Sequence, residues 1–245
     1  MNCTKISLIK YSKNIRIKGE QKMKYLGSFR DLVKKSRVFR RYVLNVRKLP
    51  VRLPTFVSTM TEAKNDTINR YGTEFAIKTE GYTLSEYHRA LYTMIRILKP
   101  ELIIETGVFE GHSSLSILSA LKENNKGFLY SIDLPSPDLP SGKVPGWMVP
   151  EHLRKRWDLR AGKSSDLLPT LLEEVKDVDI FLHDSEHSYE NMYWEYKTAW
   201  AHIKTGGLLL SHDVSQNAAF RDFAKHVSEE YYYMLKNLGG IKRTK

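Results

Sequence analysis

The sequence predicts an α/β fold built on a doubly wound, mostly parallel sheet, and three observations lead to this prediction. Short apolar runs alternate with segments of helical period over most of residues 83–241. Glycines and acidic residues follow several of these runs, where strands would end. With 245 residues and 41% hydrophobic content, the chain can bury one sizeable core. Strands that alternate with helices indicate a sheet covered on both faces.

The expected elements follow from the apolar periods and the turn residues between them. Strands are expected at 102–105, 128–134, 157–161, 178–182 and 208–211, with a final hairpin formed by 231–234 and Ile241. Helices are expected at 83–98, 113–125, 165–175, 189–203 and 218–230. Residues 55–82 lack a clear period and are interpreted as a connector, and the Pro- and Gly-rich residues 135–156 as a lid loop.

Charge divides the chain into two predicted domains, a basic extension at 1–53 and a globular domain at 54–245. Residues 1–53 hold 16 Lys and Arg against 2 Asp and Glu, whereas the remainder holds 23 against 26. Such an arm suits an anionic surface or membrane, and equally a solvated extension or a helix packed on the body. The single cysteine, Cys3, cannot form an internal disulfide, so we expect a cytoplasmic protein.

The central motif, ETGVFEGHS at 105–113, lies between a predicted buried strand and a predicted helix. Gly107 permits a tight turn after the strand, and Gly111 permits close approach of a ligand or of the helix. Free N–H groups at the start of the helix can hold an anionic group. The spacing is G-x-x-x-G rather than the dinucleotide fingerprint G-x-G-x-x-G, which weakens the alternative of a nicotinamide-dependent oxidoreductase.

Two further segments extend this predicted ligand site. Asp133 ends the next strand, about 20 residues past the glycine loop, where an acid accepts hydrogen bonds from ribose hydroxyls. Taken alone, Asp133 would be an ordinary turn residue before a proline. Ser164 and Ser165, with Asp166, precede a helical segment and could cap it or present their side chains to a purine.

His and Asp residues follow two neighbouring predicted strands. His183, Asp184 and His187 come after one strand, and His212 and Asp213 after the next. The carboxyl ends of parallel strands meet at the edge of the sheet where ligands bind. Asp184, His212 and Asp213 could share a divalent cation there, and His187 could serve as the base that takes a hydroxyl proton, with Asp184 as its catalytic partner. His183 could instead be a satisfied core residue.

At these residues the chain resembles the class I S-adenosylmethionine (SAM) dependent methyltransferases. The branch it is most similar to includes catechol O-methyltransferase-like, macrolide sugar O-methyltransferase-like and cephalosporin hydroxylase-like proteins. The motifs that carry the resemblance are ETGVFEGHSS, GKSSDLLP, HDSEHSYENM and GGLLLSHDV, in that order within about residues 80–240. The resemblance implies a Rossmann-like seven-stranded sheet, SAM as cofactor, and a small-molecule or sugar hydroxyl as methyl acceptor.

The resemblance also implies roles for individual residues. Residues around the methionine part of SAM would be Glu105, Gly107, Phe109, Gly111 and Ser113. Asp133 would hold the ribose, and Ser164 and Ser165 would border the adenine. The metal ligands of metal-dependent members fall on Asp184, His212 and Asp213, and the base on His187.

His212 departs from the branch, which usually has an acid at that place. Mg²⁺ prefers oxygen ligands, whereas an imidazole favours Mn²⁺, Fe²⁺ or Zn²⁺, so the sequence leaves open both the need for a metal and the choice between Mg²⁺ and Mn²⁺. Two alternatives remain: hydroxylase-like chemistry on the same fold, and an RNA-binding or RNA-modifying protein that uses the basic arm. We find no RNA-binding motif, so nucleic acid is not an expected partner, and we expect a homo-oligomer.

Overall fold

The computed structural model describes residues 53–233 and 238–245, with side chains from Phe56 onward. The chain divides into two units, Met1–Leu49 and Pro50–Lys245, and the second contains these residues. The predicted basic arm, its surface helix and its membrane contact lie outside the described residues. The domain boundary that we expected at residue 53 therefore stays a prediction.

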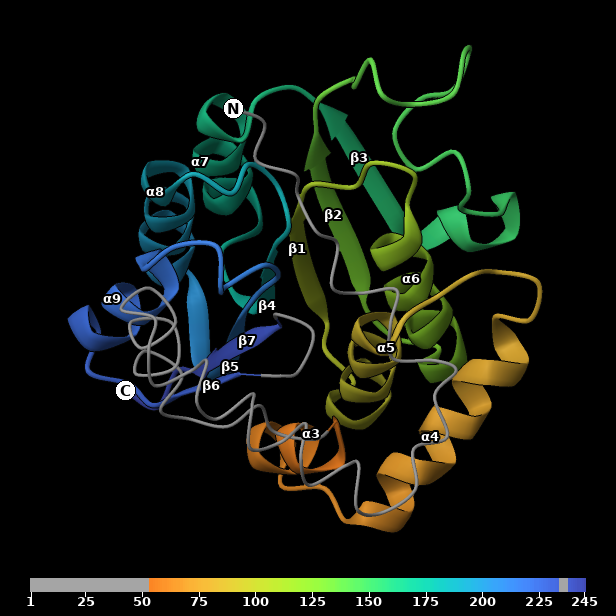
Figure 1. Ribbon diagram of the computed structural model, residues 1–245, viewed down its shortest axis with the longest axis horizontal. Helices are drawn as coiled ribbons and strands as arrows, with labels where there is room; N and C mark the ends of the chain where they lie inside the picture. The colour runs from red at the N-terminus through yellow and green to blue at the C-terminus, as the bar shows by residue number, and fades with distance from the viewer. Residues whose placement is uncertain (1–52, 234–237) are drawn as a thin grey trace, which may run out of the picture. The chain divides into compact units, whose positions relative to one another are not determined.

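A seven-stranded sheet forms the centre of the fold (Figure 1). The strand order is β3-β2-β1-β4-β5-β7-β6; the first five run parallel, and β7 pairs antiparallel with β5 and β6. The strands are β1 Leu102–Thr106, β2 Phe128–Asp133, β3 Trp157–Ala161, β4 Val178–His183, β5 Ile203–Ser211, β6 Tyr231–Tyr233 and β7 Gly239–Lys242. The strand order reverses between β1 and β4, which is where doubly wound sheets bind ligands. The predicted fold class is confirmed.

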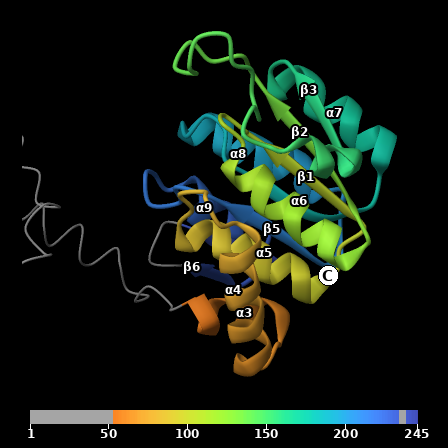
Figure 2. The same ribbon diagram turned by 90° about the vertical axis from the view of Figure 1, so that its right-hand side faces the viewer.

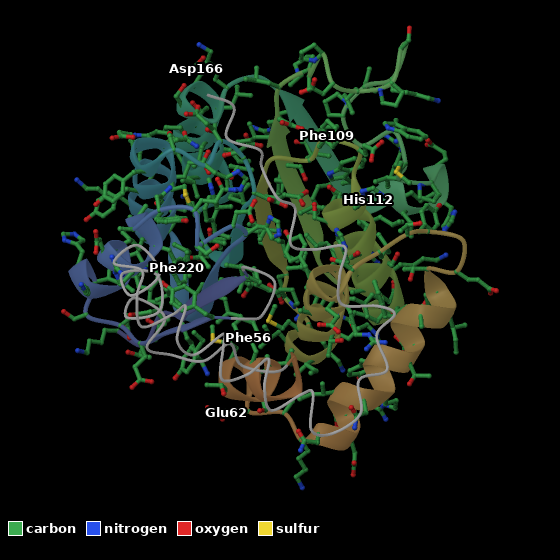
Figure 3. All side chains as sticks on the ribbon, viewed as in Figure 1. Phe56, Glu62, Phe109, His112, Asp166 and Phe220 are labelled. Carbon is green, nitrogen blue, oxygen red and sulfur yellow. The ribbon has the colours of Figure 1, made fainter. Side chains whose placement is uncertain are left out.

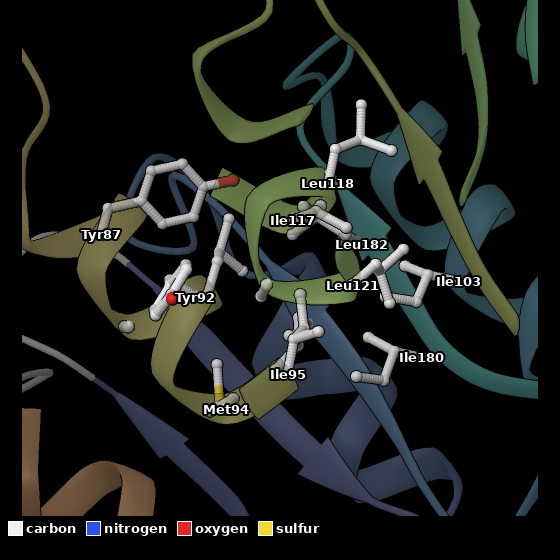
Figure 4. Packing of buried hydrophobic residues seen from close by; sticks show 14 of the residues in the cluster. Tyr87, Tyr92, Met94, Ile95, Ile103, Ile117, Leu118, Leu121, Ile180 and Leu182 are labelled. Carbon is white, nitrogen blue, oxygen red and sulfur yellow. The ribbon is translucent and has the colours of Figure 1, made fainter. Parts of the chain in front are cut away.

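Neighbouring residues of one strand point to opposite faces of the sheet and so enter two separate cores. Ile103 of β1 packs in the core beneath helices α5 (Glu86–Leu98) and α6 (His112–Asn124), whereas Ile104 packs in the core beneath α7 (Ser164–Val175), α8 (Tyr189–Trp200) and α9 (Ala219–His226). Figure 4 shows side chains of α5 and α6 packed against β1 and β4 in the first of these cores. Helices therefore cover both faces, as the alternation of elements predicted.

Residues 55–82 are not a connector, and this expectation is wrong. They contain α3 (Leu53–Thr61) and α4 (Asn65–Lys78), which lie below α5 in Figure 2. Phe56, Ile68 and Phe75 are almost fully buried in the same core as α5. The helix α3 has only nine residues, and α4, although it has 14, buries only Ile68, Gly72 and Phe75, so neither gave a clear helical pattern.

Three other expectations about the elements need correction. The helix expected at 189–203 ends at Trp200, because Ile203 already pairs with Val178 at the start of β5. The last helix spans only Ala219–His226. The loop at 135–156 ends in a 3-10 helix, η2 (Glu151–Arg156). Among the described residues, no helix is long and apolar enough to cross a membrane.

Candidate functional site

A cavity of about 1010 Å³ opens at the carboxyl ends of β1, β2, β4 and β5. This volume lies at the upper end of the range typical of small-molecule and cofactor sites, about 300–1,000 Å³. Of the residues predicted for SAM, the lining includes Gly107, Phe109, Ser113, Asp133, Ser164 and Ser165. It also includes Asp184, His212 and Asp213 from the predicted metal site. Residues from five segments of the sequence thus meet in one place.

The glycine loop is shaped by close contact between backbones. Gly107 has φ +86°, and a Cβ on it would lie 2.1 Å from the carbonyl oxygen of Asp184. Only glycine tolerates both the positive φ and this contact. Gly111 has φ +102° and faces Gly146 of the loop at 135–150, so it accommodates that loop and does not line the cavity. Phe109 and His112 lie at the same end of the sheet (Figure 3).

Asp133 fixes the glycine loop from the neighbouring strand. Its Oδ2 accepts hydrogen bonds from the backbone N–H of Val108 at 3.0 Å and of Phe109 at 2.7 Å, and its Oδ1 accepts from Leu134 at 2.8 Å. One carboxylate thus holds the end of β2 and the loop after β1 in register. Its lone pairs also face the cavity that it lines, where ribose hydroxyls can donate to them.

Glu105 does not reach the cavity, although it was predicted to border SAM. It is fully buried below the loop, and its Oε2 accepts hydrogen bonds from Ser114 at 2.6 Å and Ser131 at 2.8 Å. Burial raises the pKa of Glu105 to about 7, although hydrogen bonds from serines oppose this. The side chain therefore supports the loop from inside the fold.

Ser164 and Ser165 line the cavity, but they do not cap α7 as was considered possible. The helix begins at Ser164, and its cap residue is Lys163, which makes no side-chain capping bond. Ser165 donates to Asp166 at 3.0 Å. The two serines therefore stand in the first turn of the helix, with positions suited to a purine edge.

Asp184, His187, His212 and Asp213 form a compact cluster at the ends of β4 and β5. His212 Nδ1 lies 3.0 Å from Asp184 Oδ1 and 3.6 Å from Asp213 Oδ2. His187 Nε2 lies 3.7 Å and 3.8 Å from the same two oxygens. Asp184, His187 and His212 have donor atoms all within 4.8 Å of one another, a spacing that a metal ion can bridge.

The charges of the cluster stabilise one another. Burial opposes ionisation of Asp184, but its contacts with His187, His212 and Tyr87 hold the pKa of this carboxyl below its usual range. Burial likewise opposes protonation of His212, but Asp184 and Asp213 hold the pKa of its imidazole above the usual value. Tyr87 donates its hydroxyl to Asp184 Oδ2 at 3.0 Å and stacks on His212. The cluster is therefore ionic and held in place by α5.

A buried carboxylate, Glu195 of α8, supports the cluster from below. It accepts hydrogen bonds from Thr106 at 2.5 Å and Ser185 at 2.8 Å, and its Oε2 lies 2.6 Å from His183 Nδ1. His183 is fully buried and partnered, as its interpretation as a core residue predicted. Ser188 caps α8 by accepting from the N–H of Asn191. These bonds fix both ends of the segment that carries Asp184 and His187.

Several cavity residues were missed from the sequence. The start of α5 contributes its cap residue Ser85 together with Tyr87 and His88, and the glycine loop and the start of α6 add Glu110 and His112. The predicted lid contributes only its start, since Leu134 and Pro135–Pro137 line the cavity, whereas Trp147 and His152 from the later part of the loop do not. Trp147 instead lies under Lys143, and the loop is tied to Phe109 by the N–H of Gly146.

Comparison with known proteins agrees with this geometry. Residues 104–214 match the model of a family described as a methyltransferase domain. No curated protein matches the sequence. The fold is similar to the O-methyltransferase NovP, with a TM-score of 0.52, 16% identity, and coverage of 65% of this chain and 79% of that one.

Two other solved structures share the fold. The O-methyltransferase TomG from Streptomyces achromogenes, solved with SAM, has a TM-score of 0.52 at 14% identity over 79% of this chain and 96% of that one. The methyltransferase PaMTH1 from Podospora anserina, solved with S-adenosylhomocysteine (SAH), has a TM-score of 0.52 at 13% identity over 95% of this chain and 100% of that one.

The fold and the site together define an α/β enzyme with its ligand cavity at the strand reversal. More particularly, residues 104–214 match a methyltransferase domain, which agrees with the predicted methyltransferase, and the predicted Rossmann-like fold is confirmed.

Proposed function

We propose that this protein transfers the methyl group of SAM to a hydroxyl oxygen of a small molecule or sugar. The observation that carries the proposal is a single cavity that joins two kinds of site. Asp133 and the loop at Gly107 form one side, and Asp184, His212 and Asp213 form the other. His187 lies beside this second side but does not itself line the cavity. A cofactor and an acceptor bound on these two sides would meet at their reactive atoms.

SAM would lie along the loop between β1 and α6. Asp133 would accept hydrogen bonds from the ribose, and Ser164 and Ser165 would border the adenine. Two of the similar structures contain SAM or SAH, which supports this choice of cofactor. The sulfonium already activates the methyl group, so the protein has to align acceptor oxygen, methyl carbon and sulfur. Alignment of this kind can lower a barrier by roughly 7–11 kcal/mol.

His187 is the proposed base. Its Nε2 is buried, has no hydrogen-bond partner among the described residues, and lies 3.7 Å from Asp184, which lines the cavity. An acceptor would therefore have to approach His187 past Asp184 to give up its proton. Asp184 and Asp213 lie 3.7 Å and 3.8 Å from this nitrogen and would stabilise the imidazolium that forms. A positioned base of this kind contributes about 10²–10⁴-fold to the rate.

A divalent cation fits the same cluster. The residues whose donor atoms lie close enough to share it are Asp184, His187 and His212, so His187 takes the place that was predicted for Asp213. Asp213 lies beside them, 3.6 Å from His212 Nδ1, and would be a further ligand. Two imidazoles beside carboxylates favour Mn²⁺, Fe²⁺ or Zn²⁺ over Mg²⁺. When bound, such an ion lowers the pKa of an acceptor hydroxyl. His187 cannot serve as ligand and as free base at once, so each role predicts a different effect of its removal.

A second candidate function is favoured by the composition of the cluster. Two histidines and one carboxylate are also the ligand set of non-haem Fe²⁺ oxygenases. The cephalosporin hydroxylase-like members of the branch make hydroxylation on this fold the alternative. The two chemistries differ in their products, because methylation adds about 14 Da to the acceptor and hydroxylation about 16 Da.

Mass spectrometry of acceptors incubated with the protein and SAM tests the proposal. We would use catechol and simple methyl glycosides, with and without Mn²⁺, and would measure SAH in parallel. We expect SAH and a methylated product, with turnover at least about a hundredfold lower in His187→Ala. His202→Ala, which alters a histidine beside Glu173, serves as control. Full turnover of His187→Ala with unchanged SAM affinity would show that His187 is not the base.

A further inference from the structure

His88 is held in one tautomer by the start of α5. It occupies the third position of the helix, and its Nδ1 lies 2.9 Å from the backbone N–H of Ser85. A backbone N–H can only donate, so Nδ1 must accept and the ring proton must be on Nε2. Burial, and the nearby His112 and His212, lower the pKa of His88 to about 4. The ring is therefore a neutral donor at neutral pH.

The Nε2–H of His88 is the group on this ring that a ligand in the cavity could use. His88 lines the cavity wall beside Ser85 and Tyr87. Its Nδ1 is engaged by Ser85, whereas no hydrogen bond to its Nε2 occurs within residues 56–233 and 238–245. Nε2 is also absent from the buried unpartnered atoms, so it is accessible to solvent.

His88 belongs to a small polar group at the end of the cavity between α5 and α6. Its ring lies 5.8 Å from the ring of His112, and His112 Nδ1 lies 3.8 Å from a carboxylate oxygen of Glu110. All three residues line the cavity, as does Ser113 in the first turn of α6. The group thus offers a fixed neutral donor, a carboxylate, and the electropositive end of a 13-residue helix.

These chemical features match the two charges of an α-amino acid. A carboxylate binds at a donor beside a helix N-terminus, and an ammonium binds at a carboxylate. The adenine and ribose positions proposed above lie at Ser164, Ser165 and Asp133, away from α5. The methionine part of SAM would then extend toward this end of the cavity.

We propose that His88 determines specificity for the amino-acid end of SAM, by donating from Nε2 to its carboxylate while Glu110 faces its ammonium group. The proposal rests on the proposed function, because it requires SAM in this cavity. It assigns to a helix-capping side chain a second role in ligand recognition, and it explains why a histidine stands where Glu or Gln would complete the capping box.

Calorimetric titration with SAH and with 5′-methylthioadenosine, which lacks the amino-acid group, tests the proposal. The matched variants are His88→Gln and His88→Glu, since both side chains can accept from Ser85 and cap the helix. Only Gln can also donate to the ligand. We expect His88→Gln to bind SAH within a fewfold of the wild type, and His88→Glu to bind it about tenfold to a hundredfold more weakly. The affinity for 5′-methylthioadenosine should be the same in all three proteins.

Equal SAH affinity of the two variants, or an equal loss for both ligands, would overturn the assignment of His88. No binding of either ligand to the folded wild type would instead contradict the proposed function. Should His88→Glu fail to fold, ¹⁵N NMR of the wild-type histidines decides the matter. The proposal requires a protonated Nε2 on His88 and a change of its shift with SAH that 5′-methylthioadenosine does not produce.

Discussion

The ionisation of Glu105 should make the stability of this protein decrease as the pH rises through neutrality. Glu105 is fully buried, and only its Oε2 has hydrogen-bond partners among the described residues. Burial raises its pKa from 4.5 to about 7. A carboxyl with a raised pKa in the folded state contributes stability that is fully present below pH 4.5 and is lost as the pH rises through 7.

The size of this effect follows from the two pKa values. Each tenfold change in an ionisation constant corresponds to roughly 1.4 kcal/mol, so values of 4.5 and about 7 correspond to a loss of about 3 kcal/mol. Folded domains are stable by only about 5–15 kcal/mol, so the loss is measurable. Glu105→Gln cannot ionise, and its amide oxygen can still accept from Ser114 and Ser131. The variant should lack this component of the pH dependence.

Urea denaturation followed by tryptophan fluorescence at pH 5, 6, 7 and 8 measures the effect. We expect the stability of Glu105→Gln relative to the wild type to increase by about 2.5 kcal/mol from pH 5 to pH 8, because part of the total loss has already occurred at pH 5. Glu151→Gln, which alters a side chain that is 95% exposed, should show no such trend. A difference between Glu105→Gln and wild type that stays constant over this range would refute the reasoning.

Three other predictions follow from the packing and from the cluster. Gly107→Ala should cost at least about 2 kcal/mol more than Gly142→Ala in denaturation, because both glycines have positive φ but only Gly107 would clash; equal costs would contradict this. Phe56→Ala should destabilise the fold by about 3–5 kcal/mol in denaturation, whereas Ile77→Ala, at an exposed site, should cost about 0.5 kcal/mol or less. Equal small costs would show that α3 does not contribute to the stability of the core. His212→Ala should weaken Mn²⁺ binding about tenfold or more in a calorimetric titration, whereas an unchanged affinity would exclude His212 as a ligand.

Local patterns were sufficient for the central part of the fold. Strand runs such as 178–182 are continuous and apolar because parallel strands are buried on both faces. The same reasoning failed where packing between segments that are distant in the sequence determines which element a residue joins. Ile203 continues the helical spacing of α8, but it pairs with Val178 at the start of β5. Phe56 lies in a nine-residue helix, and Phe75 lies in a 14-residue helix with only three buried residues, so neither segment shows a strong apolar period.

The sequence correctly predicted those residues of the candidate site that directly follow a strand. Asp184, His212 and Asp213 do meet, because the carboxyl ends of β4 and β5 are adjacent. The sequence could not show that Glu105 points into the core, since the last residues of a strand can face either way. It also could not show that His88 faces the cavity, which depends on how α5 packs on the sheet. A histidine three residues after Ser85 was the available signal.

Calorimetric titration of the full chain with SAM, alongside Asp133→Asn and with NADH as a competing ligand, tests the central claim most directly. Asp133→Asn keeps one oxygen for the N–H groups of Val108 and Phe109 but loses a negative acceptor for the ribose. We predict micromolar binding of SAM by the wild type, at least about tenfold weaker binding by the variant, and no binding of NADH. A folded wild type that binds NADH, or that binds no SAM, would contradict the claim that this cavity is a SAM site.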